Sequence, residues 1–107
     1  MAPADGAEDC PPVQVPDGAL AREIPIVNKK GLHARASAKF VQTVERFDAD
    51  VTVTRCGETV GGRSIMGLLT LGAAQGTTIT VVADGDDAGA CLDALASLVA
   101  GRFGEDE

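Results

Sequence analysis

Two segments in which apolar and hydroxylated side chains alternate constrain the fold of this sequence more than any other feature. The segment "VTVTRC" at 51–56 alternates valine with threonine, and "TTITVV" at 77–82 alternates threonine with isoleucine and valine. Successive side chains of a strand point to opposite faces, so this alternation predicts strands whose two faces differ. The sheet that they form has one hydroxylated face in water and one apolar face that needs helices over it.

Two further segments have the composition of strands. The segment "EIPIVN" at 23–28 is apolar on one side, but Pro25 has no amide hydrogen to donate, so we expect this strand at an edge of the sheet. Gly57 and Glu58 predict a tight turn into a short strand, "TVGG", at 59–62.

Two longer segments, 34–47 and 87–103, have the periodicity of helices. The apolar residues at that spacing are Phe40, Val41, Val44 and Phe47 in the first segment and Ala88, Leu92, Leu95, Val99 and Phe103 in the second. A third segment, "SIMGLLTLG", is interrupted by Gly67 and predicts only a short helix with Ser64 as its N-cap. The predicted order is strand–helix–strand–strand–helix–strand–helix, which is an α+β fold.

The first 20 residues differ from the rest of the chain. They hold four of the five prolines and four acidic residues, with no lysine or arginine. Such a segment cannot bury enough apolar surface to offset its ordering entropy. We therefore predict a disordered, acidic, proline-rich extension at 1–20 and one folded domain at 21–107, since the chain is too short for two cores.

Charge is unevenly distributed along the chain. The formal net charge is −7, yet the stretch from 24 to 44 holds Lys29, Lys30, Arg35 and Lys39 and no acidic residue. The overall acidity argues against a nucleic-acid binder, because phosphate contacts need a basic surface. The basic stretch is either a docking surface for acidic partners or an ordinary solvated face.

The three cysteines, Cys10, Cys56 and Cys91, are odd in number and far apart, which matches neither a disulfide framework nor a C-x-x-C motif. We expect reduced thiols, with Cys56 and Cys91 buried as small apolar side chains and no role for Cys10. No segment has the roughly 20 apolar residues of a membrane span. The N-terminus lacks the pattern of a secretory signal. A soluble, cytoplasmic, monomeric protein is expected.

His33 is the one histidine of the chain, and it immediately precedes the predicted helix. The amides of Ala34, Arg35 and Ala36 then belong to the first helical turn and lack intrahelical acceptors, which makes them an anion site. A neutral imidazole at that edge can attack phosphorus, and Arg35 can present its guanidinium to phosphate oxygens. The structural alternative is a capping or merely solvated histidine. One histidine without nearby carboxylates in sequence offers no metal-ligand set, so neither a metal nor another cofactor is expected.

Two motifs carry a resemblance to a known family. "NKKGLHARASAKF" at 28–40 closely resembles the active-centre motif of HPr, the histidine-containing phosphocarrier of the phosphoenolpyruvate-dependent phosphotransferase system. "GRSIMGLLTLG" at 62–72 resembles the second signature of that family, and the predicted order of elements is also the family's. The resemblance covers about residues 21–105. It implies an open-faced β-sandwich with a four-stranded antiparallel sheet in the order 1-4-2-3, covered on one face by three helices.

The resemblance also implies roles for individual residues. His33 matches the histidine that accepts a phosphoryl group from phospho-enzyme I and hands it to an EIIA-type domain. Arg35 matches the arginine that steadies that group. Ser64 matches the serine that an ATP-dependent HPr kinase phosphorylates in many bacteria. Ala36 stands where the family most often has proline, and this departure resembles the regulatory, nitrogen-type branch (NPr) of the family.

Docking residues follow from charge and exposure. Lys29, Lys30 and Lys39 are expected to attract acidic partners. The apolar side chains of Ile65, Met66 and Leu69 are expected to serve partly as core and partly as a docking patch beside His33.

Three functions are compatible with these features. The leading one is a phosphocarrier that relays a phosphoryl group through His33. The second is a regulatory binding protein controlled through Ser64, with little flux through His33. The third is a small hydrolase, against which the lack of a second acid, base or metal near His33 counts.

Overall fold

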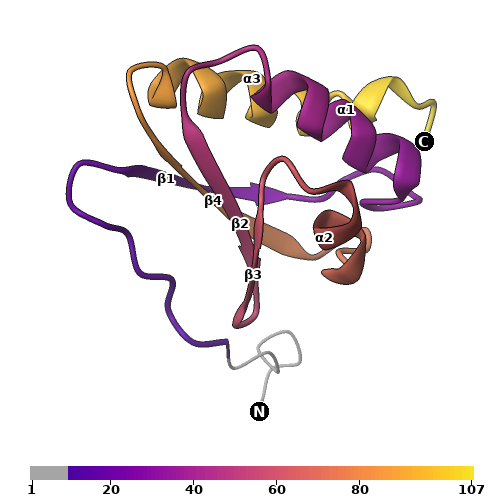
Figure 1. Cartoon of the computed structure of the whole chain (residues 1–107). Helices are drawn as coiled ribbons and strands as arrows, with labels where there is room; N and C mark the ends of the chain where they lie inside the picture. Colours follow the sequence, from indigo (N-terminus) through magenta and orange to yellow (C-terminus); the bar gives the residue numbers. More distant parts are fainter. Residues whose placement is uncertain (1–9) are drawn as a thin grey trace.

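A computed structural model describes residues 10–107 of the chain. The elements in order are β1 (Leu20–Pro25), α1 (Ala34–Val44), β2 (Asp50–Arg55), β3 (Glu58–Gly61), α2 (Ile65–Thr70), β4 (Thr78–Asp84), α3 (Ala88–Ala100) and a 3-10 turn η2 (Arg102–Gly104). Figure 1 shows the helices gathered on one side of the sheet, with the other face open. No helix in the range 10–107 is long and apolar enough to cross a membrane.

The sheet of the described region has four strands in the order β1-β4-β2-β3, and every neighbouring pair is antiparallel. The predicted open-faced α+β fold with the order 1-4-2-3 is therefore confirmed. β1 lies at an edge, as Pro25 predicts, and Pro25 pairs with Thr78 at the end of the ladder. A proline is tolerated there because β1 is an edge strand, and the next hydrogen bond to the β4 side is donated by the amide of Ile26, to Thr77 at 2.8 Å.

The alternation of the central strands separates core from surface. Val51 and Val53 of β2 and Ile79 and Val81 of β4 are buried under the helices, as expected from the sequence pattern. On the other face Thr54 is also buried, and its hydroxyl hydrogen-bonds that of Thr59 on β3 at 2.7 Å. The open face is thus less uniformly exposed to solvent than the alternation alone predicts.

The C-terminal helix is shorter than its periodicity predicts. α3 ends at Ala100, and Arg102, Phe103 and Gly104 follow with positive φ angles of 59°, 55° and 79°. This left-handed hook reverses the chain, so Phe103 is buried at 1% exposure by the hook and not by a continued helix. Two consecutive non-glycine residues in the left-handed region are strained, and such strain persists only where surrounding contacts enforce it.

The prediction of three reduced cysteines is wrong. Cys10 and Cys56 form a disulfide across a sequence separation of 46 residues, and Cys56 is exposed at the tip of the β2–β3 hairpin. The hairpin turn directs Cys56 outward, toward the N-terminal segment, a juxtaposition that spacing along the sequence does not reveal. Cys91 is a buried free cysteine, as predicted.

Residues 10–19 run from this disulfide to the start of β1, along the open side of the sheet (Figure 1). The extension predicted at 1–20 falls partly outside the described residues, since 1–9 are not among them. The division of the chain into an extension and a domain stays a prediction.

Candidate functional site

His33 occupies the N-cap position of α1. Its backbone is extended, with φ −80° and ψ −176°, and its carbonyl accepts the first intrahelical hydrogen bond, from the amide of Ser37 at 2.8 Å. The amides of Ala34, Arg35 and Ala36 lie in the first turn, where backbone N–H groups have no acceptor within the helix. The imidazole is half-buried beside them. His33 therefore directly precedes the first turn of α1, as predicted, while the use of these amides as a phosphate site stays a prediction.

Gly31 sets the path of the chain into this site. Its φ is +69°, and a β-carbon there would lie 2.5 Å from the carbonyl oxygen of Ala73. Only glycine combines this backbone conformation with such a close approach. The amide of Leu32 donates to that same carbonyl at 2.9 Å, which fixes the residue immediately before His33.

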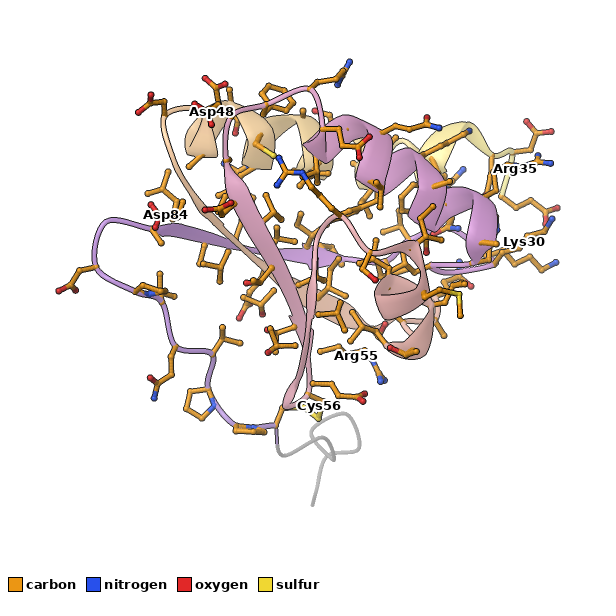
Figure 2. The ribbon with its side chains drawn as sticks, in the orientation of Figure 1. Lys30, Arg35, Asp48, Arg55, Cys56 and Asp84 are labelled. Carbon is orange, nitrogen blue, oxygen red and sulfur yellow. A yellow bond between two sulfur atoms is a disulfide. The ribbon has the colours of Figure 1, made fainter. Side chains whose placement is uncertain are left out.

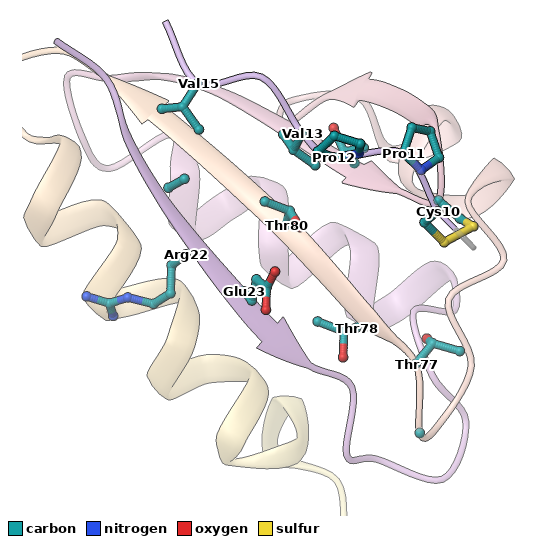
Figure 3. Close-up of a pocket in the computed structure, with 14 residues that line it drawn as sticks. Cys10, Pro11, Pro12, Val13, Val15, Arg22, Glu23, Thr77, Thr78 and Thr80 are labelled. Atoms are coloured by element: carbon teal, nitrogen blue, oxygen red, sulfur yellow. A yellow bond between two sulfur atoms is a disulfide. The ribbon is translucent and has the colours of Figure 1, made fainter. Parts of the chain in front are cut away.

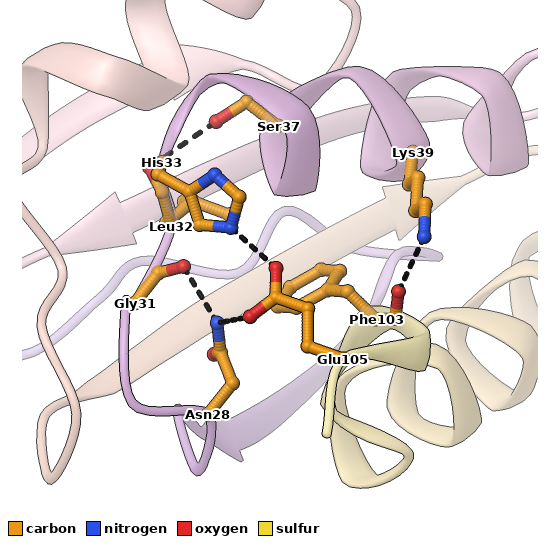
Figure 4. Close-up of polar contacts among 8 residues, drawn as sticks. All are labelled: Asn28, Gly31, Leu32, His33, Ser37, Lys39, Phe103 and Glu105. Carbon is orange, nitrogen blue, oxygen red and sulfur yellow. Dashed lines mark hydrogen bonds and ion pairs between the residues drawn. The ribbon is translucent and has the colours of Figure 1, made fainter. Parts of the chain in front are cut away.

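The imidazole has a carboxylate partner from the far end of the chain, so the expectation that no second acid or base lies near His33 is wrong. Nε2 of His33 contacts a carboxylate oxygen of Glu105, whose other oxygen accepts a 3.0 Å hydrogen bond from the side-chain amide of Asn28 (Figure 4). The same amide of Asn28 donates to the carbonyl of Gly31 at 2.9 Å. Asn28 is fully buried, and the Glu105 side chain is only 18% exposed. The carboxylate is therefore held from two sides.

The contact with Glu105 favours one tautomer of the neutral ring. The hydrogen bonds from Asn28 and His33 hold the pKa of Glu105 below its ordinary value of 4.5. Glu105 is therefore a carboxylate near neutral pH and can only accept hydrogen bonds. Nε2 must carry the proton that points at it, so in the neutral ring Nδ1 keeps its lone pair.

The predicted basic residues lie around the same site. Lys29, Lys30 and Arg35 are exposed, and Lys39 is half-buried. Together with the C-terminal residues from Gly104 to Glu107 they line a pocket. Figure 2 shows Lys30 and Arg35 at one end of the molecule, away from the labelled acidic residues Asp48 and Asp84. The predicted basic residues are thus gathered at one end of the molecule, next to the carboxylates of Glu105, Asp106 and Glu107.

The C-terminal hook partly occupies this basic face. Lys39 donates from Nζ to the carbonyl of Phe103 at 2.5 Å, and Lys29 lies 3.3 Å from a carboxylate oxygen of Glu107. Lys39 therefore anchors the hook that presents Glu105 to His33. Both partners of the Lys29–Glu107 pair are 70% exposed, so this pair contributes little stability.

The second predicted site lies on α2, which packs against α1. Ser64 is the N-cap of α2, and its hydroxyl oxygen accepts a hydrogen bond from the amide of Gly67 at 2.9 Å, as predicted. Ile65 and Met66 are 39% and 71% exposed, Leu69 is half-buried, and the neighbouring Leu68 is fully buried in the core. The core contribution of this segment comes from Leu68 and not from the three expected residues, and their role as a docking patch stays a prediction.

Sequence reasoning missed two residues of the site, Asn28 and Glu105. Asn28 stands at the start of the "NKKG" stretch, and Glu105 belongs to the acidic "GEDE" end, which carries no periodicity. Only the reversal of the chain after Ala100 brings the two together. Across residues 10–107, no group of three or more histidine, cysteine, aspartate or glutamate residues has the arrangement of a metal site.

Comparisons with known proteins agree on one class. A family model described as "PTS HPr component phosphorylation site" matches residues 20–101. The phosphocarrier protein HPr of Neisseria meningitidis serogroup A is 50% identical over 88 residues, which cover 82% of this chain and 99% of that protein. The phosphocarrier protein NPr of Shewanella violacea is 42% identical over 86 residues, covering 80% and 94%. The crystal structure of HPr-C-His from Thermoanaerobacter tengcongensis superposes with a TM-score of 0.78 at 40% identity, covering 82% and 99%.

The fold and these matches define a phosphocarrier, a protein that carries a phosphoryl group and is not an enzyme. The chain belongs to the HPr family of the phosphotransferase system. The resemblance predicted from the two motifs is confirmed.

Proposed function

We propose that His33 accepts a phosphoryl group from phospho-enzyme I and passes it to an EIIA-type protein. The observation that carries this proposal is the contact between Nε2 of His33 and the carboxylate of Glu105. From this contact we infer that the ring proton lies on Nε2 and that Nδ1 is the nucleophile.

The transfer requires one bond to form and one to break. The lone pair of Nδ1 attacks phosphorus, and the bond between phosphorus and the donor's leaving atom breaks, with its electron pair going to the donor. The imidazole keeps its proton on Nε2 and becomes more positive as the N–P bond forms. The Glu105 carboxylate faces that developing charge, so its electrostatic contribution increases along the reaction.

The phosphoryl oxygens need donors on the other side of the ring. We assign this role to the amides of Ala34, Arg35 and Ala36, with the positive end of the α1 dipole behind them. The guanidinium of Arg35 is exposed and can turn toward the group once it is present.

The surface around His33 suits acidic partners. Lys29 and Lys30 are exposed, and Ile65 and Met66 present apolar side chains from α2. Weak, exchangeable docking of both enzyme I and an EIIA-type domain fits a small apolar patch with a basic rim. Lys39 belongs to this group by sequence, but its hydrogen bond to Phe103 makes it a support of the hook first.

One labelling experiment tests the relay. The protein is incubated with enzyme I and labelled phosphoenolpyruvate, and the adduct is treated with acid and with alkali. We expect an acid-labile, alkali-stable adduct that is absent in His33→Ala and that moves to an added EIIA-type protein. A wild-type protein that takes no label, or a His33→Ala variant labelled as strongly as wild type, contradicts the proposal.

A regulatory role of Ser64 is the second candidate, because its hydroxyl is exposed at the N-terminus of α2 next to the apolar patch. A phosphate there adds a charge of about −1.5 to −2 beside a surface that attracts acidic partners. The test is an acid-stable adduct formed from ATP and an HPr kinase. Ser64→Asn is the matched variant, since asparagine keeps the cap and cannot be phosphorylated. Persistence of the label in Ser64→Asn rejects this site.

The branch of the family, the location of the protein and its oligomeric state are further proposals. Ala36 stands where the family usually has proline, and this favours the nitrogen-type branch. The branch is tested by identifying the EIIA-type partner that His33 phosphorylates in a lysate. We also propose a cytoplasmic, monomeric protein whose folded domain spans residues 21–107.

A further inference from the structure

The segment between the disulfide and β1, residues 10–19, is here called the N-terminal strap. The family match begins at residue 20, so the strap lies outside the part of the chain that the family describes. The disulfide between Cys10 and Cys56 joins the strap to the tip of the β2–β3 hairpin. The strap therefore bridges from the hairpin to the start of β1 along the open side of the sheet.

Cys56 occupies an unusual position for its residue type. The turn of the hairpin is formed by Cys56 and Gly57, which both have positive φ angles, of 48° and 88°. Two-residue turns of this kind prefer asparagine, aspartate or glycine, since other side chains are strained there. Cys56 adopts this strained conformation at the tip of the β2–β3 hairpin. Backbone outliers of this kind cluster at functional sites, which motivates a functional hypothesis for Cys56.

The strap has little non-covalent packing to hold it. All of its residues are exposed except Val13 and Ala19, which are half-buried. A pocket separates it from the sheet (Figure 3). The strap side of this pocket is lined by Pro11, Pro12, Val13 and Val15, and the sheet side includes Thr54, Thr78 and Thr80. Close approach is found at the hairpin tip, where the ring of Pro11 lies 3.4 Å from a β-carbon built on Gly57. The disulfide is a covalent tether between the strap and the hairpin.

We propose that the Cys10–Cys56 disulfide is a site of reversible thiol–disulfide exchange, and that its reduction by a dithiol releases the strap from the open face of the sheet. Both cysteines are exposed, so a reducing thiolate can reach either sulfur. Cys91 provides the contrast, because it is fully buried and burial raises the pKa of its thiol.

The exchange balances as a two-electron step. A thiolate of the dithiol attacks Sγ of one cysteine, the S–S bond breaks, and the other cysteine leaves as a thiolate that takes up a proton. The second thiol of the reductant then attacks the reductant sulfur in the mixed disulfide. This step closes a disulfide within the reductant and releases the second cysteine of the protein as a thiolate. The dithiol is oxidised to a disulfide, and Cys10 and Cys56 are reduced to two thiols. Oxidised glutathione reverses the step.

Release changes what the sheet presents to solvent. Thr54, at 7% exposure, and Thr80, which is half-buried, line the space under the strap. Freed from Cys56, the strap leaves the hydroxylated surface of β2 and β4 open. The exchange site lies at the hairpin tip, and the His33 site lies at the start of α1. The labelled positions of Cys56 and Arg35 in Figure 2 are correspondingly far apart in the molecule. This proposal does not depend on phosphoryl transfer.

The test combines alkylation with NMR on the folded full chain. The air-oxidised protein is expected to take no maleimide label, and after excess dithiothreitol it is expected to take two, on Cys10 and Cys56, while Cys91 stays unlabelled. Amide ¹⁵N relaxation is expected to show residues 13–19 becoming mobile on reduction, with α1 and α3 unchanged. Oxidised glutathione is expected to restore both signatures.

Matched variants isolate the pair. Cys10→Ser and Cys56→Ser should each give a mobile strap that no longer responds to dithiothreitol, whereas Cys91→Ala should respond as the wild type does. The proposal is overturned if the oxidised protein still takes labels on Cys10 and Cys56, or if excess dithiothreitol leaves the disulfide intact in the folded protein. It is also overturned if reduction leaves residues 13–19 as rigid as before.

Discussion

Glu105 and His33 lie 72 residues apart in the chain, and the carboxylate of Glu105 contacts Nε2 of the imidazole. The connection depends on the left-handed hook after α3, on the hydrogen bond from Lys39 to Phe103 and on the buried amide of Asn28. The C-terminal residues of this chain are thus part of the histidine site. We infer that they orient the nucleophile and compensate the charge that it gains.

Removing the charge of Glu105 should slow phosphorylation of His33. In Glu105→Gln the side-chain oxygen can still accept the Nε2 proton, but it no longer compensates a positive ring. We expect the rate of labelling by phospho-enzyme I to fall about tenfold, which corresponds to ~1.4 kcal/mol of transition-state stabilisation. Glu105→Ala should be slower still. Glu107→Gln is the control, because Glu107 is a 70% exposed acid of the same tail. Equal losses in both glutamine variants would point to a general charge effect in place of the contact.

The lowered pKa of Glu105 predicts a loss of stability in acid. A carboxyl group with a depressed pKa in the folded state contributes stability that is fully present above its unfolded pKa and disappears as pH falls through the folded pKa. The difference in the free energy of unfolding between wild type and Glu105→Gln should therefore be present above pH 4.5, the ordinary pKa of the carboxyl, and should shrink as pH falls below that value. Urea unfolding at a series of pH values measures this difference. A difference that grows as pH falls below 4.5 has the wrong sign and contradicts the prediction.

Gly31→Ala should be more damaging than a substitution at a glycine with the same backbone conformation. Gly72 has φ +61° and no atom within 4 Å of an added β-carbon, whereas Gly31 has φ +69° and a backbone oxygen at 2.5 Å. The left-handed backbone alone costs a non-glycine residue roughly 1–2 kcal/mol, so we expect Gly72→Ala to lose about that much. Gly31→Ala should lose clearly more and should also displace the ring signals of His33 in NMR spectra. Equal losses would show that the approach of Ala73 does not constrain the site.

Ser64 should contribute to stability as a cap independently of any phosphorylation. Its hydroxyl accepts the amide of Gly67, so Ser64→Ala removes a partner of the first turn of α2. We expect a loss of about 1 kcal/mol, or a decrease in melting temperature of about 4–8 °C for a domain of this size. Ser64→Asn should remain within a fraction of that loss. Thermal unfolding of the wild type, Ser64→Ala and Ser64→Asn tests this prediction. An unchanged melting temperature for Ser64→Ala would show that the hydrogen bond from Gly67 to Ser64 does not stabilise the fold.

Local patterns predicted most of the fold. The alternation of β2 and β4 placed Val51 and Ile79 in the core, and Pro25 placed β1 at an edge, because these features follow from strand geometry alone. The ends of elements were less predictable. The helix expected to reach 103 stops at Ala100, since burial of Phe103 is achieved equally well by a reversal of the chain.

The histidine site was only half predictable for the same reason. His33 and the amides after it are neighbours in sequence, and a helix start suffices to bring them together. Glu105 and Asn28 meet through tertiary structure, and no periodic pattern marks either of them. Cys10 and Cys56 show the limit most clearly. Because the two cysteines are far apart in the sequence, we expected free thiols. The direction of one hairpin turn brings them together as a disulfide.

The central claim is that His33 receives the phosphoryl group on Nδ1 because Glu105 holds the proton on Nε2. The most direct measurement is ³¹P–¹⁵N NMR of the protein labelled at histidine nitrogen and phosphorylated by enzyme I and phosphoenolpyruvate. The account predicts a phosphorus signal coupled to Nδ1 of His33, with Nε2 still protonated. A signal coupled to Nε2, or no phosphohistidine at all, would contradict it.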